Sequence, residues 1–406
     1  MKASFSRKER RMSTISGKVR EAMERASWIR RMFEEGLRLK QEHGEDAVCD
    51  LTLGNPMVEP PASFHKRLKE VVSSPVPGMH RYMPNAGYPW VRERIAEHYR
   101  RETGLEFGAQ HIIMTCGAAG ALNVVLKSLL DPGDEVVVFA PYFPEYLFYV
   151  DNHGGVPKIV PTNNDFSINL VQLESALTER TKAVLVNSPN NPTGVLYGRY
   201  TFQALGDLLE RYTKKSGRPI YLINDGPYRK IVYDGRETPY AFEFYRNSIE
   251  VTSHSKDLAI PGERIGHIAI NPEADGASDI ANACTFTNRT LGFVNAPALM
   301  QRVVAELQDV TVDISDYQAK RDLLYEQLSE MGYEVVKPEG AFYFFPRTPS
   351  DDDLKFVNEL KKRLVLVVPG SGFGAPGHFR ISYCVPKEMI ERALPAFNEV
   401  ARLHGL

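Results

Sequence analysis

The sequence predicts an α/β fold, in which a large domain with a mostly parallel sheet between helices is joined to a smaller α+β domain. Between residues 112 and 270, short apolar segments rich in β-branched residues alternate with helical segments. This alternation is typical of parallel strands that are covered on both faces. Beyond about Asn295 the alternation stops, and a helical stretch at 298–331 precedes several short strands. A chain of 406 residues is long enough for both domains.

The first hundred residues are predicted to be mostly helical. Apolar side chains recur at helical spacing within residues 16–43, and Gly44 is a typical helix stop. A short strand at 51–53 then leads into a proline-rich passage that ends at Pro77. A helix with a strongly charged face is predicted at 90–101.

The rest of the chain divides into the alternating region and a C-terminal region. In the alternating region, helices are predicted at 121–130 and 202–212, and strands at 112–114, 135–140, 183–187, 220–224, 249–252 and 265–270. In the C-terminal region, strands are predicted at 334–336, 342–344, 365–368 and 379–383.

The composition argues against several functional classes. Lys plus Arg (49) nearly balances Asp plus Glu (51), so no overall field favours nucleic acid or an anionic membrane. The basic residues at 7–11 are predicted to form a solvated tail, and no apolar run approaches membrane-spanning length. The cysteines form no CxxC pair that would suggest a bound metal, and sparse thiols fit a reducing compartment. We therefore expect a soluble, cytoplasmic protein without nucleic-acid or membrane partners.

One lysine stands in a setting suited to a phosphorylated aldehyde. Lys256 ends the string Ser253-His254-Ser255-Lys256, and Arg264 follows eight residues later. The amine can form an imine with a carbonyl, while the hydroxyls and the guanidinium hold a phosphate. The alternative is a surface lysine beside a loop. His254 is expected to serve packing, although it could also tune the site.

Two further motifs are predicted to surround the same ligand. At 115–122 a strand runs into Gly117, Ala118 and Ala119 and then a helix, so that free backbone N–H groups and the positive helix end face one point. The alternative is a tight strand-to-helix connection. At 187–194 a turn rich in Asn and Pro follows a buried strand and presents amide side chains at the carboxyl edge of the sheet.

A carboxylate is predicted at the end of another strand. Asp225 follows the strand at 220–224, and Tyr228 stands three residues later. Asp225 could pair with a protonated ring nitrogen and hold the ring cationic, which makes a pyridine an electron sink. The alternative is an aspartate that caps a helix.

These motifs occur in an order that resembles the class I/II aminotransferases, which are pyridoxal-phosphate enzymes of fold type I. The resemblance runs from about Ser16 to the C-terminus and rests on Gly54, residues 82–87, Gly117, Phe143, residues 191–194, Asp225 with Tyr228, residues 253–256, Arg264 and Arg380. It implies a flexible tail (1–15), an N-terminal arm that joins the small domain (16–60), a large cofactor-binding domain (61–297) and a small C-terminal domain (298–406).

The resemblance implies a role for each cofactor-binding residue. Lys256 would carry pyridoxal 5'-phosphate as an internal aldimine and then move the proton between the substrate Cα and the cofactor C4′. Asp225 would pair with the pyridinium nitrogen, Asn191 and Tyr228 would bind O3′, and Phe143 would stack on the ring. The phosphate would be bound by Gly117, the Ala118–Ala119 backbone, Ser253, Ser255 and Arg264. Relatives often have Gly, Ser or Lys where this chain has the two alanines. At these positions, therefore, only the backbone would contact the phosphate.

The resemblance also implies the substrates and a partner. The substrates are an amino acid, whose α-carboxylate Arg380 would bind beside the Gly54 backbone, and a 2-oxo acid. A homodimer would share its active sites, with Tyr82 and Asn295 reaching the partner; a core tyrosine and a helix-capping asparagine are the alternatives. Arg289, near Asn295, would favour aspartate or glutamate as donor, unless it is a structural arginine that pairs with a surface carboxylate.

Two points stay open. Gly226 follows Asp225 where many relatives have glutamate, and the sequence offers no role for it. The same fold also carries β-lyases and decarboxylases, so the bond that breaks is not determined by the motifs. A non-catalytic regulator that binds the cofactor is a remote alternative, because it needs a DNA-binding module ahead of Gly54, where only one helix and a tail are predicted.

Overall fold

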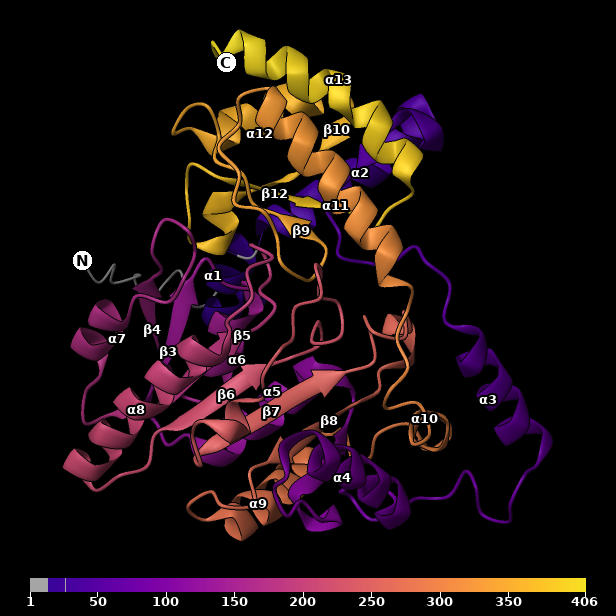
Figure 1. Cartoon of the computed structure of the whole chain (residues 1–406), viewed down its shortest axis with the longest axis vertical. Coiled ribbons are helices and arrows are strands. Elements are labelled where there is room, and N and C mark those ends of the chain that lie inside the picture. The colour runs from indigo at the N-terminus through magenta and orange to yellow at the C-terminus, as the bar shows by residue number, and fades with distance from the viewer. Residues whose placement is uncertain (1–13, 26) are drawn as a thin grey trace.

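The computed structural model describes residues 14–25 and 27–406. The basic residues at 7–11 and most of the predicted tail therefore lie outside the described residues. Figure 1 shows two parts of the molecule: a lower part built around a large sheet, and an upper part in which the C-terminal helices lie beside an N-terminal helix.

The lower part contains a seven-stranded sheet in the order β2-β8-β7-β6-β5-β3-β4. All pairings are parallel except those of β8, which runs antiparallel to both neighbours. The strands are β2 (Ile112–Thr115), β3 (Glu135–Ala140), β4 (Val156–Pro161), β5 (Thr181–Asn187), β6 (Tyr221–Asp225), β7 (Ser248–Ser253) and β8 (Gly266–Ile270). The predicted fold class, with a mostly parallel sheet, is confirmed.

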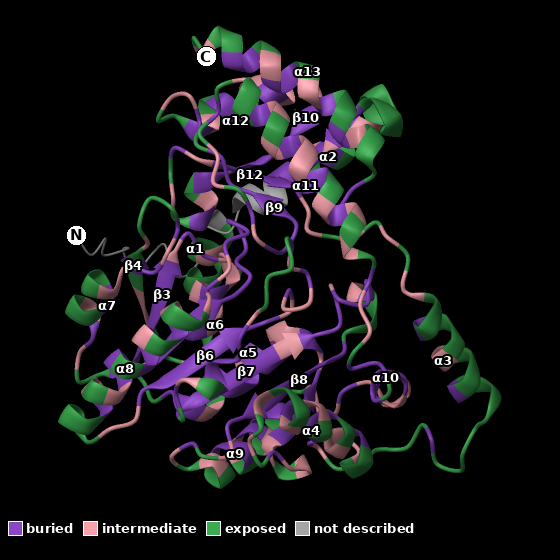
Figure 2. Cartoon of the chain, in the orientation of Figure 1, coloured by how far each residue is buried: buried purple, intermediate pink, exposed green. Residues whose placement is uncertain are grey.

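Helices cover both faces of this sheet because its strands are apolar on both sides. In β3, Val136 and Val138 pack into one hydrophobic cluster, whereas Val137 and Phe139 pack into another on the opposite face. The first face is covered by α5 (Gly117–Leu129), α6 (Glu145–Asn152) and α9 (Ala277–Thr290), and the second by α7 (Leu170–Ala176) and α8 (Arg199–Ser216). Figure 2 shows β6 and β7 buried, while the outer faces of α7 and α8 are exposed.

The β2–β8 side of the sheet carries a third hydrophobic cluster. It is formed with α3 (Ala62–Ser73), α4 (Pro89–Thr103) and α10 (Ala298–Val304). The helix predicted at 298–331 is thus two helices, α10 in the lower part and α11 (Ile314–Glu330) in the upper part. The chain between them, residues 305–313, crosses from one part to the other. None of the described helices is long and apolar enough to cross a membrane.

The upper part joins segments from both ends of the described chain. In its two small sheets, β1 (Cys49–Asp50) pairs in parallel with β10 (Val365–Leu366), and β12 (Phe379–Ser382) lies antiparallel between β11 (Val368–Pro369) and β9 (Tyr343–Phe344). Its helices include α2 (Ser27–His43), α12 (Asp353–Lys361) and α13 (Lys387–Leu403), and α1 (Gly17–Arg25) precedes α2. The division into domains at residues 15, 60 and 297 stays a proposal, and the packing of α10 favours a boundary a few residues after 297.

Candidate active site

A cavity of about 370 Å³ lies where the parallel strands of the large sheet end. Asn187, Asp225 and Ser253 end β5, β6 and β7, and all three line it. The upper part contributes the opposite wall. The cavity brings together most of the predicted residues: Gly54, Ala118, Ala119, Phe143, Asn191, Asp225, Tyr228, Ser253, Ser255, Lys256, Arg264 and Arg380. Carboxyl ends of parallel strands are where open α/β sheets bind ligands.

Lys256 is half-buried in this cavity, on the loop that follows β7. Its Nζ donates a hydrogen bond to the backbone oxygen of Gly54 at 2.5 Å and lies 5.6 Å from the centre of the Phe342 ring. Burial lowers the pKa of Lys256 to about 8, and the charges of Arg380 and Arg264 act in the same direction. With a pKa of about 8, roughly a tenth of the amine is an unprotonated nucleophile at pH 7, far more than for an ordinary lysine.

The lowered pKa of Lys256 predicts how fast cofactor-free protein captures pyridoxal phosphate. The rate should rise with pH through about 8 and level off above it, because only the unprotonated amine attacks a carbonyl. Stopped-flow absorbance measures the rate across pH. A rate that keeps rising towards about pH 10, where an ordinary lysine titrates, would contradict the shifted pKa.

Asp225 presents one unpartnered carboxylate oxygen to the cavity. Its Oδ2 accepts a hydrogen bond from the Tyr146 hydroxyl at 2.6 Å, whereas its buried Oδ1 has no hydrogen-bond partner among the described residues. Burial raises the pKa of Asp225 to about 7; the Tyr146 hydrogen bond opposes this shift, and the charge of Glu250 adds to it. A cation placed against Oδ1 would therefore ionise the carboxyl group, as a protonated ring nitrogen does.

Asn187 holds the backbone around Asp225 and Asn191. Its Nδ2 donates to the Asp225 backbone oxygen at 2.6 Å, and its Oδ1 accepts from the Asn191 backbone N–H at 2.7 Å. The turn at 187–194 is thereby fixed to the end of the neighbouring strand β6. Gly226, whose role the sequence left open, makes room for the buried Glu250 carboxylate, which a Cβ at this position would overlap.

Arg380 is a buried cation without a carboxylate partner among the described residues. Its side chain is 3% exposed and lies between the rings of Tyr343 and Phe373, each 4.7 Å from Cζ. Nη1 donates to Asn191 Oδ1 at 2.9 Å, and Nη2 donates to the backbone oxygen of Thr52 at 2.5 Å. Because neutral acceptors compensate a buried guanidinium only partly, this position is suited to a carboxylate ligand.

Tyr343 and Tyr146 are site residues that sequence reasoning missed. The hydroxyls of Tyr343 and Tyr228 share a hydrogen bond of 2.9 Å, and a Cβ at Gly54 would overlap the Tyr343 hydroxyl. The absence of a side chain at Gly54 thus admits the ring of Tyr343. Phe143, which lines the cavity, packs edge-to-face on Tyr146 with 5.5 Å between ring centres. An aromatic residue in an apolar segment carries no local signal that separates such a role from core packing.

The start of α5 and the loop after β7 form one polar corner of the cavity. Gly117 has a φ of 75°, and a Cβ there would lie 2.9 Å from Arg264 Nη2, so the glycine permits the close approach of that guanidinium. The Ser253 hydroxyl donates to the Ser255 hydroxyl at 3.1 Å. Backbone N–H groups at a helix start, two hydroxyls and a guanidinium match the needs of a phosphate.

Four predicted residues do not line this cavity: Gly117, which adjoins it beside Arg264, and Tyr82, Asn295 and Arg289. Tyr82, which is 90% exposed, and Asn295 line a separate surface pocket of about 650 Å³. Asn295 Nδ2 donates to the backbone oxygens of Met83 and Pro84, each at 3.2 Å. Arg289 is exposed near the end of α9, where its guanidinium lies 5.4 Å from the Phe286 ring. Within one protomer, Arg289 has no part in the cavity.

A buried polar cluster lies behind Lys256. Asp257 Oδ2 accepts a hydrogen bond from Lys230 Nζ at 2.9 Å and lies 3.2 Å from His254 Nδ1. Although burial acts in the opposite direction, Lys230 and His254 lower the pKa of Asp257. The Asp257 backbone oxygen also accepts from the Val312 N–H at 2.7 Å. These bonds hold the loop that carries Lys256, so His254 does more than fill space.

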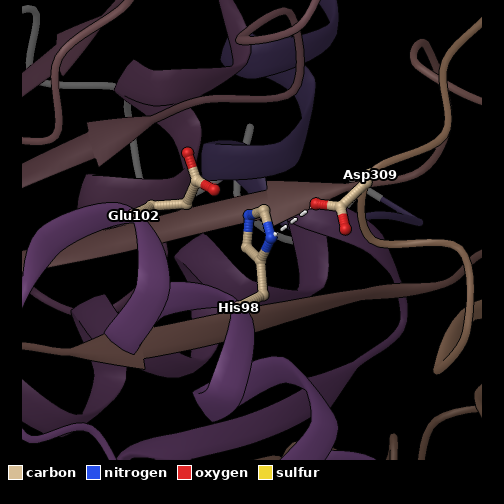
Figure 3. Close-up of side chains that lie close together, drawn as sticks. All are labelled: His98, Glu102 and Asp309. Atoms are coloured by element: carbon tan, nitrogen blue, oxygen red, sulfur yellow. Dashed lines mark hydrogen bonds and ion pairs between the residues drawn. The ribbon is translucent and has the colours of Figure 1, made fainter.

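Figure 3 shows a further cluster, His98, Glu102 and Asp309, at the edge of α4. Their ligand-type atoms lie within 4.8 Å of one another, a spacing at which three side chains could hold a metal ion. However, Arg101 Nη2 donates to His98 Nδ1 at 2.9 Å and to Asp309 Oδ1 at 2.5 Å. His98 Nδ1 and Asp309 Oδ1 also lie 3.1 Å from each other, so the Arg101 guanidinium already contacts both groups and compensates the charge of Asp309.

The sequence matches the family described as aminotransferase class I and II over residues 46–397. The probable aspartate/prephenate aminotransferase of Thermus aquaticus is 35% identical over 363 residues, which cover 88% of this chain and 92% of that protein. The aspartate/prephenate aminotransferase of Thermus thermophilus is 32% identical over 371 residues, which cover 90% and 94% of the two chains.

Solved structures agree with the sequence relatives. An amino transferase of Eubacterium rectale has a TM-score of 0.93 at 38% identity, covering 97% of this chain and 100% of that one. The aspartate aminotransferase of Thermus thermophilus with maleate has a TM-score of 0.82 at 29% identity, covering 98% and 99% of the two chains. With the family match extending over most of its length, the chain belongs to the class I and II aminotransferases, a family of pyridoxal-phosphate-dependent enzymes.

Proposed function

We propose that this protein transfers the amino group of an L-amino acid to a 2-oxo acid, using pyridoxal phosphate attached covalently to Lys256. One observation carries the proposal: a single cavity gathers an amine of lowered pKa, a carboxylate with one oxygen that no described residue contacts by a hydrogen bond, and a guanidinium that pairs with no described carboxylate. The amine would bind the aldehyde of the cofactor, the carboxylate would pair with its ring nitrogen, and the guanidinium would bind the α-carboxylate of the substrate.

The residues of the cavity fit the cofactor. The free Oδ1 of Asp225 is suited to a protonated ring nitrogen, and Arg264 beside Gly117 is suited to the phosphate. Tyr228 and Asn191 supply hydrogen-bonding groups for O3′, and Phe143 supplies an aromatic face for the ring. When bound, the cofactor supplies an electron sink for bonds at the substrate Cα.

The chain's own side chains then bind the substrate and move the proton. Arg380, buried without a carboxylate partner among the described residues, binds the α-carboxylate and orients Cα towards Lys256. The Lys256 amine, when it is not bound to the cofactor, would take and hold the proton that leaves the substrate Cα. The pKa of about 8 in the free protein favours this role, because a general base works best when its pKa lies near the working pH.

The identity of the donor is a finer question. The prediction of aspartate or glutamate rested on Arg289, which lies outside the cavity of its own protomer. The names of the Thermus relatives refer to aspartate, and that is a statement about those proteins. An acidic donor would therefore need a cation from elsewhere, such as a second copy of the chain.

Incubation of the purified protein with amino acids tests the reaction type. With a donor alone, the absorption of the aldehyde form of the cofactor should disappear, and a 2-oxo acid should restore it. Release of pyruvate and ammonia without any acceptor would show β-elimination instead, and release of carbon dioxide would show decarboxylation. Either outcome would replace transamination by another reaction of the same fold.

We also propose a homodimer with shared active sites, formed through the surface of Tyr82 and Asn295. The Asn295 backbone oxygen accepts a hydrogen bond from Cys116 Sγ, and Cys116 directly precedes Gly117 at the predicted phosphate corner. This surface therefore adjoins the cavity from outside. The exposed Tyr82 hydroxyl is free to reach the phosphate corner of a second copy.

Subunit mixing tests the shared site. Lys256→Ala and Tyr82→Ala proteins should each have little activity, yet their mixture should recover part of it, because one site of the heterodimer has both native residues. Tyr200, which is 93% exposed on α8, provides a matched control: Tyr200→Ala protein should keep its activity before mixing. A monomer that is fully active at low concentration would overturn the shared site.

A further inference from the structure

We propose that Glu145 selects the donor by its side chain, favouring amino acids that end in a cation over those that end in a carboxylate. This inference rests on the proposed transamination, since it concerns the part of the same cavity beyond the α-carboxylate. It departs from the sequence prediction of an acidic donor, and also from the substrate in the names of the Thermus relatives.

The position of Glu145 in the cavity is the first observation that supports this role. Glu145 is the first residue of α6 and lines the cavity that holds Lys256 and Arg380. Its Oε2 is buried and has no hydrogen-bond partner among the described residues. No lysine or arginine of the described chain forms an ion pair with it; burial raises the pKa of Glu145, and the charge of Arg380 acts in the opposite direction. A buried carboxylate oxygen without a partner is costly, and such a group marks a place where a ligand can supply the missing donor.

The basic side chains of the cavity are the second observation that supports this role. Of its three basic side chains, Lys256 is the proposed cofactor lysine, Arg264 belongs to the phosphate corner, and Arg380 is the proposed α-carboxylate site. No further lysine or arginine of the described residues lines the cavity. Within one protomer, a distal carboxylate would thus face Glu145 without a cation of its own, whereas a distal ammonium or guanidinium would give Oε2 its partner.

A structural role is the competing explanation for Glu145. A carboxylate in the first turn of a helix is favoured by the helix dipole, and Glu145 satisfies that description. A carboxylate that only stabilises the helix need not face the cavity. Its removal would lower the stability of the protein and leave its ligand preference unchanged. The two explanations therefore differ in what the Glu145→Gln exchange does to ligand preference, because that exchange keeps the shape and removes the charge.

Binding of unreactive analogues tests the proposal without turnover. Glutarate and 4-guanidinobutanoate both offer one carboxylate to Arg380, differ in the charge of the distal group and carry no α-amino group. In calorimetric titrations of the holoprotein, 4-guanidinobutanoate should bind about tenfold or more tightly than glutarate. Glu145→Gln should remove most of this difference, and the conservative Glu145→Asp should keep the preference for the cation.

Matched controls separate this proposal from the proposed function. Asp279, an exposed carboxylate in the first turn of α9, stands outside the cavity, so Asp279→Asn should leave the ratio of the two affinities unchanged. Conversion of the cofactor by L-alanine, a donor without a distal charge, reports on transamination itself. If L-alanine and all other donors fail to convert it, the proposed function fails.

Two outcomes would overturn the role of Glu145 while leaving transamination intact. One is a wild-type holoprotein that binds glutarate as tightly as 4-guanidinobutanoate, or more tightly. The other is a Glu145→Gln protein with the wild-type ratio of affinities. In either case L-alanine would still convert the cofactor, so the donor class would be wrong and the reaction type would stand.

Discussion

Lys256→Ala protein should bind pyridoxal phosphate without a covalent link and lose nearly all turnover. Proton transfer by a positioned side chain is worth about 10²- to 10⁴-fold in rate. The loss of covalent activation adds to this, so we expect a fall of about four orders of magnitude or more. Borohydride reduction of the wild-type holoprotein, followed by peptide mapping, should place the label on Lys256.

A second lysine provides the control for this experiment. Burial also lowers the pKa of Lys182, which lies over the Tyr221 ring and outside the cavity. Lys182→Ala protein should therefore keep the label on Lys256 and most of its activity. A label on any lysine other than Lys256 would end the assignment, because a lowered pKa alone would then not identify the reactive amine.

The strands of the large sheet were predictable because their apolar runs are local and continuous. The strand predicted at 135–140 has the bounds of β3, and those predicted at 183–187 and 249–252 are extended by one or two residues at one or both ends. The prediction failed next to β3, where α6 and β4 were missed. β4 is an edge strand whose side chains are mostly half-buried or exposed, so its sequence lacks an apolar run.

Site residues within the recognised motifs were predictable in the same way. Asp225 ends β6, and Lys256 and Asn191 lie in the loops that follow β7 and β5, so the chain order alone brings them to one edge of the sheet. Their chemical roles remain proposals. The partners that orient them depend on packing over long separations: Tyr146 lies 79 residues from Asp225, and Tyr343 lies 115 residues from Tyr228. No local pattern encodes such contacts.

Arg289 on α9 and Asn295, six residues later, both lie outside the cavity of their own protomer. The predicted role of Arg289 concerns the site that a second copy of the chain would share, and it stays a prediction. Glu145 is the converse case: two residues after the predicted Phe143, it reaches the cavity because α6 begins at its rim.

Asp225→Asn protein should keep its fold and bind the cofactor, yet lose about 10³-fold in rate, equivalent to about 4 kcal/mol of barrier. An amide cannot hold the ring nitrogen cationic, so the negative charge that develops at the substrate Cα is poorly stabilised. Rapid-mixing measurements of the half-reaction with a single donor report this step directly. Rates near those of the wild type would show that the ring nitrogen has another partner.

The stability of the cofactor-free protein separates this loss of rate from misfolding. Burial raises the pKa of Asp225 to about 7 in the folded protein, above the value of about 3.9 in an unfolded chain. Ionised Asp225 thus destabilises the fold, increasingly as pH rises from about 4 to 7 and fully above that. Asparagine carries no such charge, and its amide oxygen can still accept the Tyr146 hydroxyl. At about pH 8 the Asp225→Asn apoprotein should therefore melt no lower than the wild type. Asp134→Asn, which removes a buried carboxylate paired with Arg218 outside the cavity, should instead lower the melting temperature and leave the half-reaction unchanged.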